Sequence, residues 1–135
     1  MQVRLGRILV AAIAVEVLAV LVLVVLVALA GHSEPAAAEA YAQRLGFWVG
    51  PIAGFVLCVI GGWWAARRLA TAHLINGLAL GVVAAAIDVA ILLASGTEFQ
   101  PIFAVSNIGR LVAGGMGGLL AARSQHAADE RSVAP

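Results

Sequence analysis

Three ionisable residues, Glu16, Asp88 and Arg110, lie within long apolar stretches of the chain. An arginine guanidinium stays charged at any physiological pH. Hydrocarbon offers it no partner, so another group of the protein or water must meet it. Glu16 and Asp88 are the acids that could do so. The chemistry open to such groups is the binding of a cation or the movement of a proton within a membrane.

The same charges also have a purely structural interpretation. A static ion pair between Asp88 and Arg110 would fix the register of two helices, although such pairs often contribute little net stability. We expect Asp88 to be the nearer partner because the spans that carry it and Arg110 form a hairpin. Glu16 would then be left over, and it would have to be protonated, hydrated or paired in another way. The sequence leaves both interpretations open.

No pattern predicts catalysis, a cofactor or a metal. No nucleophile stands with a base and an orienting group, and His32, His73 and His126 share no metal-ligand spacing and are expected on the surface. The run Gly114-Gly-Met-Gly-Gly118 lacks the Lys-Ser/Thr pair of a phosphate-binding loop. Cys58 is the single cysteine, which excludes an intramolecular disulfide. We therefore expect a protein that is not an enzyme.

Composition indicates a membrane protein. The chain has 135 residues, of which 63% are hydrophobic and 11% are charged, whereas about 45–50% apolar residues is usual. A membrane span needs roughly 20 residues, so four spans with short loops use nearly the whole chain. No arginine-rich patch with interleaved aromatics predicts nucleic-acid binding. Lysine is absent and Ala, Val and Gly abound, which is typical of a GC-rich bacterial genome.

The sequence therefore predicts an all-α fold, a single membrane domain with four transmembrane helices and the lipid bilayer as its partner. The expected spans are residues 5–30, 46–66, 74–94 and 101–122, followed by a flexible tail over 123–135. A helix beginning at Pro35, with Ser33 as its N-cap, is expected to lead into the second span. A cleaved signal peptide is the alternative for residues 1–30, but the apolar core is longer than the roughly 7–15 residues of such a segment.

The arginines predict the orientation. Cytoplasmic loops carry an excess of basic residues, and one side of the predicted topology collects five arginines: Arg4, Arg7, Arg67, Arg68 and Arg123. Both termini are therefore predicted to be cytoplasmic, in a bacterial inner membrane. The pattern G-G-x-x-A-A-R also occurs twice, at 61–67 and 117–123. Two related helical hairpins would produce this repeat, and so would a chance match.

Small residues recur every four positions on three spans, which allows close backbone approach in lipid. The stripes comprise Gly46, Gly50 and Gly54, then Gly77 and Gly81, then Gly114 and Gly118. They predict either packing within the bundle or association with a second copy or a membrane-protein partner. Residues three, four and seven apart share a helix face. Asp88 and Arg110 lie at such spacings from the glycines of their spans, so we expect them to face into the bundle. We call Glu16, Asp88, Asn107 and Arg110 the charge cluster.

The stretch from Gly61 to Gly81 resembles a pattern in small uncharacterised bacterial four-span proteins, in which a G-G-x-x-A-[RK]-[RK] helix end precedes a Gly-rich span. This resemblance implies a four-helix bundle and no known activity. Glu16 within Ala14-Val-Glu-Val17 is similar to the first span of small multidrug resistance transporters, but the later spans and Arg110 depart from that family. The predicted role is a non-enzymatic structural or accessory component that associates through Gly-rich helix faces. The alternative is a small proton- or cation-coupled transporter or channel that uses Glu16, Asp88 and Arg110.

Overall fold

The structure is a computed structural model that describes residues 3–31, 33–96 and 98–133, with side chains up to residue 126. Four α-helices make up these residues, and no strand occurs among them: α1 (Leu5–Leu29), α2 (Pro35–Ala66), α3 (His73–Ala94) and α4 (Pro101–Val133). Each helix is long and apolar enough to cross a membrane. The predicted all-α fold with four spans is confirmed, and the chain is a multi-pass integral membrane protein.

The helix boundaries differ from the prediction in two places. Pro35 begins α2, so the expected interfacial helix and the second span form one continuous helix. Glu34, rather than Ser33, occupies the N-cap position, and its side chain makes no capping hydrogen bond. The end of the fourth helix also differs, because α4 continues through most of the predicted tail to Val133. Neither Gly nor Pro interrupts residues 119–133, and the Ala, Arg, Gln and Glu in this segment favour a helix.

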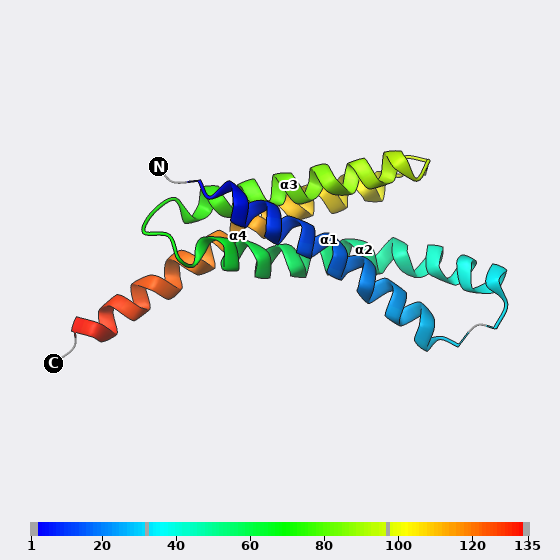
Figure 1. The fold of residues 1–135 in the computed structure, drawn as a ribbon, viewed down its shortest axis with the longest axis horizontal. Helices are drawn as coiled ribbons and strands as arrows, with labels where there is room; N and C mark the ends of the chain where they lie inside the picture. Colours follow the sequence, from blue (N-terminus) through cyan, green and yellow to red (C-terminus); the bar gives the residue numbers. More distant parts are fainter. Residues whose placement is uncertain (1–2, 32, 97, 134–135) are drawn as a thin grey trace.

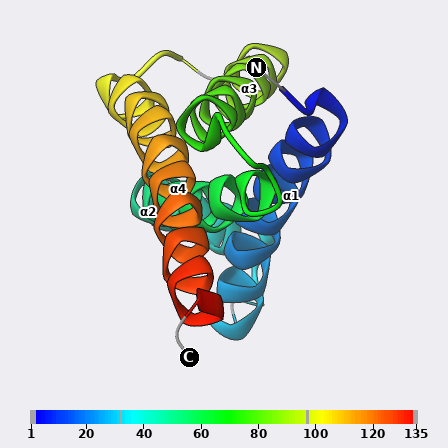
Figure 2. The same ribbon diagram turned by 90° about the vertical axis from the view of Figure 1, so that its left-hand side faces the viewer.

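The helices form two hairpins, α1–α2 and α3–α4 (Figure 1). Both chain ends and the α2–α3 connection lie at one end of the molecule, which we call the termini end. The α1–α2 and α3–α4 connections lie at the opposite end, the loop end, where the two hairpins diverge in Figure 1. Figure 2 shows α1 and α4 on opposite sides of the bundle, with α2 and α3 between them.

Glycines bring α4 into backbone contact with its neighbours. A Cβ atom added to Gly81 would lie 2.6 Å from the Arg110 carbonyl oxygen, and one added to Gly62 would lie 2.6 Å from that of Gly114. Gly77 and Gly118 likewise have α4 and α3 backbone against them, with no room for a side chain. The glycines of α3 and α4 therefore pack inside the chain. Van der Waals contact of this kind is what holds helices together in lipid.

The packed interior near the termini end is built from small side chains. The fully or nearly fully buried residues there are Ile8, Ala11, Ala12, Val15, Cys58, Ala65, Leu80, Ala84 and Ala113. Large Leu, Val and Ile side chains instead lie on the outer surface of all four helices, where lipid would surround them. At the termini end the guanidinium of Arg7 stacks 4.7 Å from the centre of the Trp64 ring and donates a hydrogen bond to the Trp64 carbonyl.

Candidate functional site

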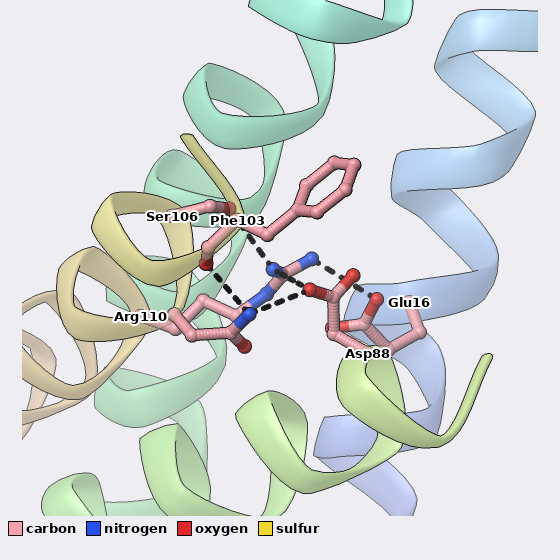
Figure 3. Close-up of polar contacts among 6 residues, drawn as sticks. Glu16, Asp88, Phe103, Ser106 and Arg110 are labelled. Carbon is pink, nitrogen blue, oxygen red and sulfur yellow. Dashed lines mark hydrogen bonds and ion pairs between the residues drawn. The ribbon is translucent and has the colours of Figure 1, made fainter. Parts of the chain in front are cut away.

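Arg110 is the centre of a buried polar site, with only 3% of its surface exposed. Its Nη2 donates to Glu16 Oε2 at 3.1 Å, and its Nη1 lies 2.9 Å from Asp88 Oδ2. Nη1 also donates to Ser106 Oγ at 3.1 Å, one turn earlier on α4. Figure 3 shows the two carboxyl groups converging on the guanidinium from α1 and α3. The site therefore joins three helices through one side chain.

Gly54 of α2 makes this reach possible. α1 and α4 do not pack directly against each other within the described residues, so the arginine must extend across α2 to meet Glu16. A Cβ atom on Gly54 would lie 3.1 Å from Arg110 Cζ and 3.1 Å from Nη2. This is tighter than nine in ten Cβ contacts in proteins, so the guanidinium occupies the space that a side chain at position 54 would need. Sequence reasoning had assigned Gly54 to helix–helix packing.

One expectation about the charge cluster needs correction, and one residue has to be added to it. Glu16 is not the left-over charge, because Arg110 uses separate nitrogen atoms for Glu16 and Asp88. Asn107 joins the cluster through Asp88, since its Nδ2 donates to Asp88 Oδ2 at 2.9 Å and to the Phe103 carbonyl. Sequence reasoning missed Ser106. Its spacing of four residues from Arg110 on one helix was the available signal.

The charge cluster has more negative than positive formal charge. Two carboxylates face one guanidinium, which leaves an excess of one negative charge if all three groups are ionised. Three polar atoms among the buried described side chains of the cluster have no hydrogen-bond partner: Glu16 Oε1, Asn107 Oδ1 and Arg110 Nε. Buried polar groups are normally paired. The cluster therefore has hydrogen-bonding atoms that are free to contact a bound proton, water molecule or solute.

A cavity of about 860 Å³ reaches the charge cluster from the loop end. All four helices line it, and Glu98 and Gln100 of the α3–α4 connection mark its outer part, while Asp88 and Arg110 lie at its inner end. Gly46 and Gly50 of α2 also line it, and no atom lies within 4 Å of a Cβ placed on Gly50. Gly50 therefore faces open space, whereas a Cβ atom placed on Gly46 would meet the Leu23 side chain at 3.5 Å. Gly50 does not pack within the bundle, and association of this part of the stripe with a second copy or a partner stays a prediction.

A proline shapes the wall of this cavity. Pro51 lies inside α2 and lines the cavity beside Phe47. Proline has no backbone N–H, so the carbonyl of Phe47, four residues earlier, lacks its usual helical donor. In membrane proteins such carbonyl groups are tolerated where they face protein or a water-filled cavity. The carbonyl group without its helical donor thus belongs to a residue of the cavity wall.

The cavity does not continue to the termini end. Beyond the charge cluster the interior is closed by Ala12, Leu80 and Ala113, each with no exposed surface. Close contact of α4 with α2 and α3 through glycines seals the same region. The site is therefore accessible from one end of the bundle only.

The two described histidines, His73 and His126, do not contribute to this site. His73 is partly buried rather than fully solvated as expected, because its Nε2 lies 2.9 Å from Gln125 Oε1. Gln125 also donates to the Arg67 carbonyl, which fastens the extension of α4 to the α2–α3 connection. His126 is exposed, and His32 lies outside the described residues. No group of three His, Cys, Asp or Glu residues suited to a metal ion occurs in the described part of the chain.

Comparison with known proteins adds no relative: no protein family, no curated protein and no solved structure matches this chain.

Proposed function

We propose that this membrane protein binds a small cation in the loop-end cavity and carries it across a bacterial inner membrane, without enzymatic activity. The observation that supports this function best is the cavity that ends on Asp88 and Arg110. Ionisable residues inside a membrane are costly and commonly mark the path of an ion or a solute. A purely structural ion pair would need no such access from outside.

The charges favour a cationic solute. Asp88 and Glu98 line the cavity against the single positive charge of Arg110, and Glu16 adds a third carboxylate behind Arg110. The Phe47 carbonyl supplies a further acceptor on the wall. The Phe47 and Phe103 side chains line the same space, and aromatic faces attract cations.

The closed termini end favours a carrier over an open channel. A carrier exposes a central site to one side at a time, by moving one helical unit against another. The two hairpins are the natural moving units here, since they already diverge at the loop end (Figure 1). In the predicted topology the cavity faces away from the cytoplasm, so the structure would correspond to the outward-facing state of the carrier.

Uptake into proteoliposomes tests this function. Radiolabelled methylammonium, sodium and rubidium would be offered to vesicles that contain the unchanged protein, Asp88→Asn or Glu39→Gln. Glu39 is exposed and does not line the cavity, so its variant is the matched control for loss of one carboxylate. We expect uptake of at least one cation by the protein and by Glu39→Gln, and its loss in Asp88→Asn with the helical content unchanged.

Absence of uptake by the unchanged protein across this panel would refute the carrier. The structural or accessory role would then be the better proposal, with crosslinking in native membranes to find a second copy or a partner. Most of the glycines that could form such an interface are already occupied, because those of α3 and α4 pack within the chain. A partner would therefore have to use a surface outside these contacts, and Gly50 of α2 is one glycine that remains uncovered.

A further inference from the structure

We propose that the charge cluster holds one exchangeable proton, carried by Glu16, and that a cation entering the cavity displaces it. The displacement of the proton by a cation rests on the proposed function, whereas the presence of the proton does not. The argument begins from the groups that face Arg110. These are Glu16 from α1, Asp88 from α3 and Ser106 from α4, and α2 adds only the buried thiol of Cys58 nearby. Two carboxylates thus share one guanidinium.

An unbalanced charge at this depth is expensive. Transfer of an isolated ionised group from water into an apolar interior costs several kcal/mol even after relaxation, and like charges that share a site disfavour joint ionisation. Either a proton or a metal ion must therefore balance the excess negative charge. The ions Mg²⁺ and Ca²⁺ take six or more oxygen ligands. Among the described residues, the buried acceptors of the cluster without a partner are Glu16 Oε1 and Asn107 Oδ1. A proton needs only one oxygen atom, so these two acceptors are enough for a proton but too few for such a metal ion.

The hydrogen bonds assign the proton to Glu16. Asp88 Oδ2 receives an N–H from Asn107 and lies against Arg110 Nη1, and the Asp88 side chain is 20% exposed toward the cavity. Donors and water both stabilise its charged form. Glu16 receives one donor, from Arg110, and is 5% exposed. Its second oxygen, Oε1, has no partner. Figure 3 shows both carboxyl groups beside the same guanidinium.

The exchange follows from the same balance of charge. With the proton on Glu16, the charges of Glu16, Asp88 and Arg110 sum to zero. A monovalent cation bound against Asp88 would make the sum +1. Breaking the Glu16 O–H bond and releasing the proton to water in the cavity restores zero, and the new carboxylate keeps its hydrogen bond from Arg110. One proton therefore leaves for each cation that binds, with no change of oxidation state.

Infrared spectroscopy tests the proton without any need for transport. In lipid vesicles at neutral pH the unchanged protein should show the C=O stretching band of a protonated, buried carboxylic acid. Glu16→Gln should lose this band and Glu39→Gln should keep it. Asp88→Asn gives the sharper test, because it removes the excess negative charge while Glu16 stays in place. We expect the band to disappear in Asp88→Asn also.

Each alternative outcome overturns a stated part. No band in the unchanged protein would refute the bound proton, and this measurement remains available if a variant fails to fold. A band that persists in Asp88→Asn would refute the charge-balance argument, since burial alone would then hold the proton. Methylammonium chloride added in weak buffer should release about one proton per chain from the unchanged protein and none from Asp88→Asn. If the protein takes up methylammonium and shows the carboxylic acid band but releases no proton, only the proposed exchange of the proton for a cation is refuted. A band in a protein without uptake or release would refute the proposed carrier and leave the proton in place.

Discussion

Replacement of Gly54 by alanine should weaken the bridge between α4 and α1. The added methyl group would lie 3.1 Å from Arg110 Cζ and Nη2, so the guanidinium has to move by several tenths of an ångström. The Nη2–Glu16 Oε2 distance is already 3.1 Å, and the displacement would take this hydrogen bond beyond useful length. A hydrogen bond to a charged group contributes roughly 1.5–3 kcal/mol. We expect Gly54→Ala to lose stability in that range relative to its control.

Gly50→Ala is the matched control, one helical turn away on α2. Its Cβ atom meets nothing within 4 Å, and both variants gain the same intrinsic helix propensity of about 0.8–1.0 kcal/mol over glycine. The propensity difference cancels in the comparison. What remains is the effect on Arg110, which corresponds to a roughly 10- to 150-fold change in the unfolding equilibrium constant.

The assay is equilibrium unfolding in mild detergent with increasing amounts of a denaturing detergent, followed by far-ultraviolet circular dichroism. Unfolding curves for both variants would be fitted to the free energy of unfolding. Equal free energies for Gly54→Ala and Gly50→Ala would refute the reasoning. That result would mean that Arg110 reaches Glu16 without the space above Gly54.

Three further changes test other parts of the structure. Gly114→Ala should destabilise the bundle by about 1–3 kcal/mol through overpacking, because its Cβ atom would overlap the backbone of α3. Gly109→Ala is the control in the same unfolding assay. Its Cβ atom would meet only a side chain, at 3.7 Å, so it should cost little stability. Arg110→Met should cost about 3–5 kcal/mol because it leaves buried carboxylates without their cation, and simultaneous replacement of both acids by their amides should recover most of that loss; no recovery would show that packing, not charge, is the cause. Cys58 has no exposed surface, so it should resist maleimide in the folded protein and react after denaturation, as followed by mass spectrometry.

The sequence predicted the parts of the fold that depend on length and spacing. Apolar runs of span length gave four helices, and the positions of Asp88 and Arg110 relative to nearby glycines predicted that both face inward. The structure places both residues there. The boundaries of α2 and α4 were less accessible, because a helix can continue into water when no Gly or Pro stops it. The tie between Gln125 and His73 that fastens the α4 extension joins residues 52 positions apart.

The three-helix site depends on geometry that local patterns do not encode. α1 is apolar on nearly every face from Val17 to Leu29, so no periodicity in that run indicates how the helix is rotated. Whether Glu16 meets Arg110 therefore depends on the packing of α1 against α2 and α3. The loop-end cavity is likewise a result of how two hairpins diverge. The spacing of Gly54 is that of the other stripe glycines, so the sequence does not predict that the Arg110 side chain passes over it.

The separation of Glu16 from Arg110 along the chain has a consequence for biosynthesis. The two partners are 94 residues apart, and a ribosome adds about 5–20 residues per second. The first helix therefore enters the membrane roughly 5–20 s before its cationic partner has been synthesised. Its very apolar composition, with a mean hydropathy of 3.2 over its best window, compensates for one acid during that interval.

The insertion of α4 presents the opposite problem, because this helix brings a positive charge into the bilayer. α4 is the least apolar of the four spans, with a mean hydropathy of 1.2, and it carries the arginine into the bilayer. The carboxyl groups of Glu16 and Asp88 are already in the membrane and can pair with that arginine. Of the four spans, α4 therefore depends most on those synthesised before it. A chain that stops short of α4 would display unpaired acids to the quality-control proteases of the membrane.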